Sequence, residues 1–250
     1  MFRPRVIPVL LLKERILVKT TAFSAPQYIG DPINAVRIFN DSKADELVFL
    51  DISATAQNRL ISLDFVREVG EEANMPFAVG GGIRTLDHIR EVIAAGAEKV
   101  IIGTAAADNP DFVRQASEAF GASTIVVCMD VNKNWLGRQQ VWVRNASKAT
   151  GIPPIDFAKK MEEMGAGELI IQSVSRDGTM KGYDIELTKA VADAISIPVV
   201  ALGGAGSLTH LAQGYREGHA NGLAAGSMFV YQGTRKGVLI NYPERAEMNF

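Results

Sequence analysis

The sequence has few of the residues that form cross-links, phosphate-binding surfaces or membrane spans. Its 250 residues include one cysteine, Cys128, so no disulfide can form within the chain. Lysine and arginine total 26 against 28 aspartates and glutamates and form no basic run, which argues against a nucleic-acid partner held by phosphate attraction. No apolar run approaches the roughly 18 residues of a membrane span, and no secretory leader pattern opens the sequence. We therefore expect a soluble, cytoplasmic protein with no nucleic-acid or membrane partner.

Metal-ligand patterns are also missing. His88, His210 and His219 fall on or near expected helices, and no two of them have the spacing of metal ligands. Cys128 has no histidine placed to activate it, so a small buried side chain is the better interpretation. We assign no metal site.

Apolar strand-like stretches alternate along the chain with segments of helical period. Hydrophobic residues make up 47% of the sequence, enough for a full core. Residues 64–72 and 155–161 place apolar side chains three and four apart, as helices do. Eight strands alternating with helices predict the α/β class and a closed (β/α)8 TIM barrel, as one domain over residues 1–250. The expected strands are residues 5–11, 46–51, 76–80, 99–103, 124–130, 168–173, 198–202 and 221–225.

The chain reads as two copies of one half, about 1–120 and 121–250. Two glycine-bearing segments, 79–84 and 202–207, recur roughly 120 residues apart, and neighbouring strands recur at nearly the same spacing. Extending the match to the first strand of each half sets Leu11 opposite Asp130. A symmetric pair of carboxylates at the barrel mouth has thus become one carboxylate and one leucine.

Each glycine segment follows a strand and precedes a helix, an arrangement that can direct backbone N–H groups at an anion. Taken alone, such glycines only permit tight turns, but their duplication at matched spacing favours two phosphate sites. The next strand of each half ends in a glycine and a hydroxyl residue, and residues 177–179 follow the sixth strand. We therefore expect a phosphorylated small molecule with a phosphate at each end. The expected phosphate-binding residues are Gly81, Gly82, Gly103, Thr104, Asp177, Gly178, Gly204, Gly206, Gly226 and Ser227.

Two connections are longer than ordinary loops: residues 12–31 and 131–150. Both follow strands whose carboxyl ends would form the mouth, where long loops commonly cover a substrate. Trp135 and Trp142 lie in the second connection, where they could stack on a ligand or brace a hairpin.

Five motifs, residues 6–8, 45–52, 79–84, 176–179 and 203–206, together resemble the cyclase subunit of imidazole glycerol phosphate synthase. The resemblance spans residues 3 to about 230. It implies a barrel that takes ammonia from a partner glutaminase and forms imidazole glycerol phosphate and an aminoimidazole carboxamide ribotide at its mouth. It implies no metal or organic cofactor.

The resemblance assigns general acid and base roles to two acidic residues, which end the first and fifth strands. Asp130 matches one of them, and Leu11 occupies the position of the other. A positioned proton-transfer group is worth roughly 100- to 10,000-fold in rate, so full cyclase activity is not expected and enzymatic turnover is left open. Glu14 could reach into the mouth as a substitute. Lys19 and Asp51 match family positions near the substrate.

The resemblance also implies a ring of charges at the lower end of the barrel, through which ammonia enters from a glutaminase bound at the N-terminal face. Strand parity points all four matching side chains inward, where an unpaired charge is costly. The alternative is that charges at strand starts are merely solvated. The residues of this expected gate are Arg5, Glu46, Lys99 and Glu168.

Residues 8–13, 30–35 and 238–243 look like a group of cyclase paralogues from surface-polysaccharide gene clusters. That likeness implies a barrel that supplies ammonia to a sugar amidotransferase, which forms an acetamidino group. It also leaves the packing of the eighth helix open. Two other hypotheses remain: a histidine-pathway cyclase, and a structural partner that only activates a glutaminase.

Overall fold

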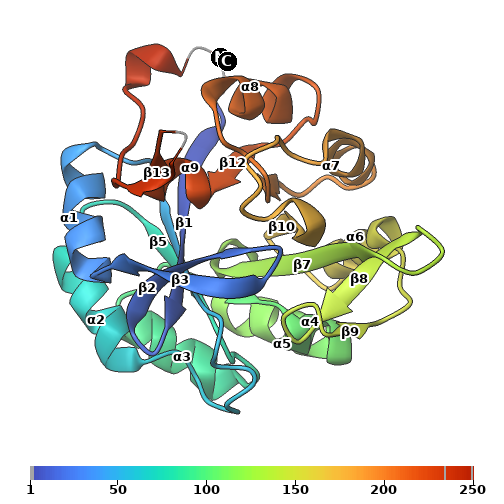
Figure 1. The fold of residues 1–250 in the computed structure, drawn as a ribbon. Coiled ribbons are helices and arrows are strands. Elements are labelled where there is room, and N and C mark those ends of the chain that lie inside the picture. The colour runs from blue at the N-terminus through green and yellow to red at the C-terminus, as the bar shows by residue number, and fades with distance from the viewer. Residues whose placement is uncertain (1–2, 234, 249) are drawn as a thin grey trace.

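A computed structural model describes residues 3–233, 235–248 and 250. Eight parallel strands form a closed barrel, because β1 pairs with both β4 and β12, and β7 pairs with β10 (Figure 1). The predicted barrel is confirmed, with each strand within three residues of its expected bounds. The barrel strands are β1 (Arg5–Lys13), β4 (Leu47–Asp51), β5 (Phe77–Gly80), β6 (Lys99–Ile102), β7 (Ile125–Lys133), β10 (Glu168–Ser173), β11 (Val199–Leu202) and β12 (Gly222–Ala225).

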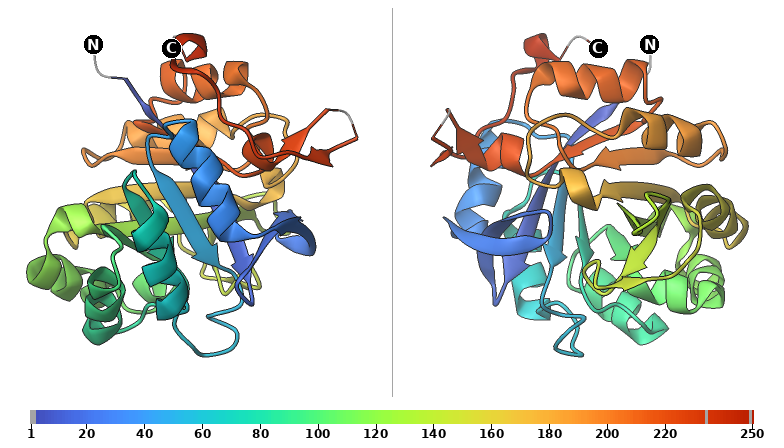
Figure 2. Two further views of the ribbon diagram at one scale, coloured as in Figure 1. Left: turned by 90° about the vertical axis from the view of Figure 1, so that its left-hand side faces the viewer. Right: turned by 45° about the vertical axis from the view of Figure 1, so that its right-hand side comes forward.

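Helices cover the outside of the barrel (Figure 2). They bury an apolar stripe against the strands, as Phe65, Val66 and Val69 do on α2. The helices are α1 (Pro32–Asp41), α2 (Leu63–Glu72), α3 (Leu86–Ala94), α4 (Thr104–Asp108), α5 (Pro110–Phe120), α6 (Pro154–Glu163), α7 (Ile185–Ala192), α8 (Leu208–Arg216) and α9 (Ser227–Val230), with short 3-10 turns η1 (Ala122–Thr124), η2 (Val174–Arg176) and η3 (Arg245–Glu247). None of the helices in the described part of the chain is long and apolar enough to cross a membrane.

Each glycine-bearing segment, 79–84 (the first glycine turn) and 202–207 (the second glycine turn), is followed by a helix, and the two helices begin in the same way. The Thr85 hydroxyl accepts the His88 N–H at the start of α3, and the Ser207 hydroxyl accepts the His210 N–H at the start of α8. Both hydroxyls satisfy a first-turn donor that the helix itself leaves free. These equivalent caps support our proposal that the chain is two half-barrel repeats, about 1–120 and 121–250.

The two long connections are hairpins, so the expectation of loops there was wrong. β1 continues past the barrel and pairs with β2 (Ile16–Thr21), which pairs with β3 (Ser24–Gly30). β7 likewise continues into β8 (Gln139–Val143), which pairs with β9 (Lys148–Ala149). Backbone pairing satisfies the polar groups of both extensions, which a long irregular loop would leave to water.

The chain ends in a hairpin and an extended segment instead of a long eighth helix. After the single turn of α9, β13 (Tyr231–Gln232) pairs with β14 (Gly237–Val238). The tail then returns to the lower end of the barrel, where the Tyr242 hydroxyl donates to the Val6 carbonyl at 3.0 Å and accepts the Asp45 N–H at 3.2 Å. The Tyr242 ring packs against Phe39 and Phe229.

Candidate functional site

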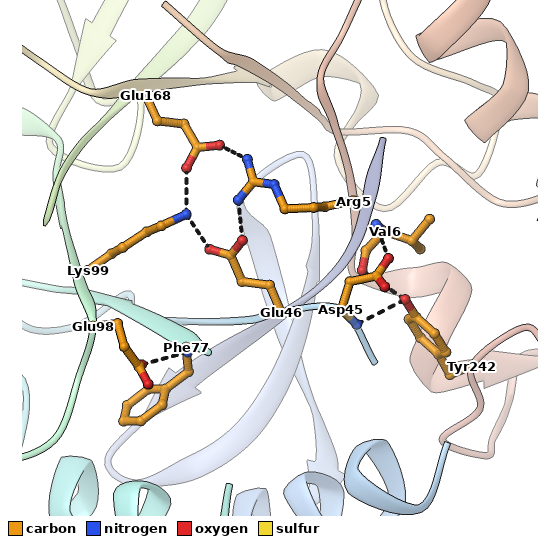
Figure 3. Close-up of polar contacts among 9 residues, drawn as sticks. All are labelled: Arg5, Val6, Asp45, Glu46, Phe77, Glu98, Lys99, Glu168 and Tyr242. Atoms are coloured by element: carbon orange, nitrogen blue, oxygen red, sulfur yellow. Dashed lines mark hydrogen bonds and ion pairs between the residues drawn. The ribbon is translucent and has the colours of Figure 1, made fainter. Parts of the chain in front are cut away.

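The four predicted gate residues form one ring of ion pairs at the floor of the barrel (Figure 3). Lys99 Nζ lies 3.0 Å from a carboxylate oxygen of Glu46 and 3.0 Å from one of Glu168. Arg5 pairs with the second oxygen of each of these carboxylates. Two cations and two anions therefore alternate around the barrel axis, and every charge has two partners.

Burial and neighbouring charges shift the pKa of Arg5 in opposite directions. Burial lowers the pKa of the Arg5 guanidinium, but the carboxylates of Glu168 and Glu46 together more than offset it, so that its pKa is raised. Arg5 thus stays charged. The carboxylates of the ring are almost completely shielded from solvent, whereas the side chains of Lys99 and Arg5 remain 21% and 30% exposed. The cations therefore face the lower surface, where a partner could reach them.

An apolar layer separates this ring from the mouth. Its members all point inward and offer no hydrogen bond: Ile7, Val9, Val48, Ala78, Ile101, Val126, Ile170, Val200, Leu202 and Ala224. Above the layer lies a cavity of about 370 Å³ at the carboxyl ends of the strands. Leu11 and Asp130 both line it, as the half-barrel repeat predicts.

Asp130 lines this cavity with a carboxyl whose pKa is shifted. Burial, with a smaller contribution from the charge of Asp177, raises the pKa of the Asp130 carboxyl to about 7. Near neutral pH the group is therefore present in both protonation states and can either accept or donate a proton. Leu11 places an aliphatic side chain where the resemblance implies a second acid.

Glu14 does not replace that acid. It is exposed in the turn between β1 and β2, with a positive φ of 52°, and it does not line the mouth cavity. The expectation that Glu14 could reach into the mouth was wrong, because β1 continues upward and carries this residue away from the opening.

Asp51 lines the cavity, but both oxygens of its carboxylate already accept hydrogen bonds from protein groups. Arg59 donates to both oxygens, at 2.6 and 3.3 Å, and the Ser53 N–H donates at 2.9 Å. Arg59 was not among the expected site residues, because it lies in the segment after β4 and no spacing in the sequence points it back at Asp51. Paired in this way, Asp51 is fixed in position.

The first glycine turn opens into the cavity together with Gly103 and Thr104. Gly81 and Gly82 have positive φ angles of 136° and 69°, and a Cβ on Gly82 would lie 1.8 Å from the Arg59 carbonyl oxygen. Only glycine fits there. The Thr104 hydroxyl accepts the Arg144 N–H at 2.9 Å, which leaves its own proton free for an anion.

The second glycine turn is covered. Of the residues expected at the second phosphate site, Gly226 and Asp177 line the cavity. Gly204 and Gly206 do not, because the segment after Gly178 packs onto them. Ser227 is 3% exposed, and its hydroxyl has no partner among the described residues. A buried hydroxyl without a partner is costly, so this position fits a ligand oxygen better than an empty space.

Lys19 and Asp177 close the mouth above the second turn. Lys19 Nζ donates to Asp177 Oδ1 at 2.8 Å, and the Thr20 hydroxyl donates to Asp177 Oδ2 at 2.9 Å. The stem of Lys19 passes over Gly226, where an added Cβ would lie 2.9 Å from Lys19 Cε. The three-stranded extension β1–β2–β3 is therefore a lid held on the second half of the barrel.

Two of the three amides of the 177–179 turn, those of Asp177 and Thr179, already have backbone partners and are not free for an anion. The Asp177 N–H donates to Ser173 and Val174 carbonyls, and the Thr179 N–H donates to the Arg176 carbonyl. Asp177 contributes its carboxylate to the lid instead.

The cysteine, the two tryptophans and His219, which the sequence analysis also considered, have the following surroundings. Cys128 lines the cavity, its Sγ is 4.0 Å from Asp130 Oδ1, and burial raises the pKa of its thiol well above the ordinary value. The Trp142 indole N–H donates to the Asn132 carbonyl and braces the β7–β8 hairpin, whereas Trp135 is 90% exposed at its tip. His219 pairs with Asp193 outside the mouth. The described residues contain no cluster of three or more ligand-type side chains that could hold a metal ion.

Comparison with known proteins gives a consistent match over nearly the whole chain. Residues 5–236 match the family described as "Histidine biosynthesis protein". A protein of Leptospira borgpetersenii described as "Putative imidazole glycerol phosphate synthase subunit HisF" is 46% identical over 244 residues, which cover 97% of this chain and 96% of the relative. The "Imidazole glycerol phosphate synthase subunit HisF" of Alkaliphilus metalliredigens is 42% identical over 231 residues, 92% of each chain. The "Putative imidazole glycerol phosphate synthase subunit hisF2" of Pseudomonas aeruginosa is 42% identical over 244 residues, 98% of this chain and 97% of the relative.

Proposed function

This chain belongs to the histidine biosynthesis protein family as a HisF-like barrel, and from that premise we propose that it is the ammonia-receiving subunit of a glutamine-dependent synthase. In this proposal a glutaminase binds at the floor, ammonia passes the ring of Arg5, Glu46, Lys99 and Glu168, and it reacts in the mouth cavity. The observation that carries the proposal is the alignment of three features along one barrel axis. These are a charged floor, an apolar layer without hydrogen-bonding groups, and a cavity that contains an acid–base carboxyl.

The names of the relatives favour the histidine-pathway reaction as the use of this ammonia. The acceptor would carry a phosphate at the first glycine turn, near Gly82 and Thr104, and a second one near the orphan hydroxyl of Ser227. Binding of the second phosphate requires the lid residue Lys19 to move or to share its charge with the ligand, because its stem covers Gly226.

In this proposal Asp130 carries the proton transfer. With a pKa of about 7, Asp130 can serve as acid in one step and as base in the next. The aliphatic Leu11 supplies no second group, so ring closure should proceed at least about 100-fold more slowly than in a barrel with two carboxylates.

Leu11 also supports a second candidate function, in which the barrel relays ammonia to a sugar amidotransferase for surface polysaccharide. The barrel has the floor ring that would admit ammonia, but Leu11 stands where a second acid–base carboxylate is expected. That combination suits a barrel that passes ammonia on and does not itself close a ring. The relatives' names give this candidate less support than the histidine-pathway reaction.

The test is turnover of the cyclase substrate by the purified chain, with its glutaminase and glutamine or with ammonium alone. The proposal expects slow but measurable product in both reactions. Glutamine-dependent product only in the presence of a sugar amidotransferase would favour the second candidate. A barrel that stimulates the glutaminase while mouth substitutions such as Asp130→Asn change nothing would instead be a structural activator.

A further inference from the structure

Gln172 is a buried polar side chain in the mouth cavity whose hydrogen-bonding groups are unused. It lies on β10, is 5% exposed and lines the cavity. Within the described part of the chain, its carboxamide makes no hydrogen bond to another protein group, and its polar atoms are not fully enclosed, because they open into the cavity. Two other carboxylates that line the cavity are engaged, since Asp51 is held by Arg59, and Asp177 by Lys19. Proteins rarely bury a polar side chain without a partner, so an unused amide that faces a cavity points to a ligand.

Its position in the barrel is defined by strand register. Gln172 pairs with Asp130 on one side and with Leu202 on the other. Residues paired in adjacent parallel strands lie about 4.8 Å apart, with their side chains on the same face. A Cβ on Gly203 would lie 3.2 Å from Gln172 Nε2, so the amide nitrogen rests against the second glycine turn.

Gln172 also stands directly above the floor ring. Glu168, Ile170 and Gln172 alternate along the inner face of β10, with Glu168 in the ring and Ile170 in the apolar layer. A small neutral molecule that rises from the ring meets no hydrogen-bonding side chain in that layer. Gln172 and Asp130 lie at the same level above it, and the weakly polar thiol of Cys128 lies one level below them, beside Ile170.

We propose that Gln172 is a positioning residue that holds incoming ammonia beside Asp130. Its carboxamide oxygen accepts one ammonia N–H, which leaves the nitrogen lone pair free to face the acceptor in the cavity. A carboxamide suits this task because it is neutral. A carboxylate at the same place would favour ammonium, which has no lone pair. This inference rests on the proposed function and specifies how the ammonia is held.

The main test replaces Gln172 by leucine, which removes both polar atoms at similar size. The KM for external ammonium should rise about 10-fold, the worth of roughly one hydrogen bond, while kcat at saturating ammonium changes little. With the glutaminase and glutamine, more glutamate should form per product. The melting temperature should change little, because the amide faces the cavity and makes no hydrogen bond to a protein group. A fall in melting temperature with equal losses of kcat in both reactions would indicate a merely structural role and overturn the inference.

Gln172→Glu is the matched variant, because it keeps the shape and the acceptor oxygen but adds charge. It should bind ammonium with an equal or lower KM and lose kcat, because it retains the protonated form. A Gln172→Glu variant with wild-type kcat and KM would contradict the need for a neutral amide.

The experiment separates this inference from the proposed function. If the wild-type chain turns over and Gln172→Leu matches it in ammonium KM and coupling, the inference fails while the function stands. If the wild type makes no product, the function fails, and nuclear magnetic resonance then decides on Gln172. Its side-chain amide signal, identified by its loss in Gln172→Leu, should shift with ammonium chloride and not with potassium chloride at the same pH. No ammonium-specific shift would overturn the inference.

Discussion

Lys19 Nζ lies 2.8 Å from Asp177 Oδ1, and this contact joins the lid strand β2 to the turn after β10. Both side chains are at least nine-tenths buried, at 6% and 10% exposure. Asp177→Asn should therefore cost about 3–5 kcal/mol of unfolding free energy, because it leaves the Lys19 charge buried without its counter-charge. Hydrogen exchange should rise selectively in residues 16–30. Glu68→Gln, which breaks the exposed pair with Arg15, is the control and should cost no more than about 1 kcal/mol. Equal losses in the two variants would contradict a clamped lid.

The floor ring predicts different effects on two sources of ammonia. Lys99→Ala removes a cation that contacts both Glu46 and Glu168. Glutamine-dependent turnover should fall several-fold more than turnover with external ammonium, because external ammonium can reach the mouth from above. Lys43→Ala changes an exposed lysine in the turn after α1 and serves as the control. Equal effects of Lys99→Ala on both reactions would argue against passage through the ring.

The raised pKa of Asp130 predicts a pH-dependent loss of stability. The folded-state pKa of about 7 lies above the ordinary value of 3.8 for an aspartate. The stability that the protonated Asp130 contributes is therefore fully present below about pH 4 and is lost as the pH rises through 7. Asp130→Asn keeps the group neutral and should remove this loss. The difference in unfolding free energy between wild type and variant should change by at most about 1.4 kcal/mol per pH unit across this window. If denaturant titrations at about pH 4 to 8 gave the same difference in unfolding free energy between wild type and Asp130→Asn at every pH, the raised pKa of Asp130 would be contradicted.

Leu11 predicts that one substitution can restore part of the cyclisation chemistry. Leu11→Asp returns a carboxyl to the mouth cavity opposite Asp130 and should raise cyclase turnover by about 100-fold or more. Leu11→Asn has similar size without an ionisable group and should leave the rate unchanged. A flat response in Leu11→Asp would show that other changes in the mouth also limit ring closure.

The hydroxyl of Tyr242, in the tail, should stabilise the lower end of the barrel. Tyr242→Phe keeps the ring contacts with Phe39 and Phe229 but removes the hydroxyl that joins the Val6 carbonyl and the Asp45 N–H. Thermal or chemical unfolding should show a loss of about 1–3 kcal/mol, because two backbone groups lose a partner. Tyr28→Phe is the control, since Tyr28 is 70% exposed and should lose almost nothing.

The barrel itself was predictable because its strands are short, apolar and regularly spaced. Buried parallel strands such as Val199–Leu202 read as near-continuous hydrophobic runs, and the proposed repeat indicated which strands correspond. The hairpin of residues 16–30 was missed because the exposed residues of β3 carry no alternating pattern, and their pairing is set by the continuation of β1, whereas a hairpin after the fifth strand was one of the two interpretations of Trp135 and Trp142.

The site was less predictable than the fold. Parity along the strands placed the floor charges inward, but it could not show that Asp51 is held by Arg59 or that the lid covers Gly226. Gln172 has no motif, and its strand reads as apolar. The signal that could have found it is its inward parity with Glu168 and Ile170 on a strand that otherwise points only apolar side chains into the barrel above the ring.

The most direct test of ammonia transfer through the barrel uses glutamine labelled with ¹⁵N in its side-chain amide, with the chain and its glutaminase, in the presence of unlabelled ammonium. If ammonia passes from the glutaminase through the floor ring, the product nitrogen should carry the label in far greater proportion than the surrounding ammonium pool. Product labelled only to the level of that pool would show that ammonia first escapes into solvent, and it would contradict the account.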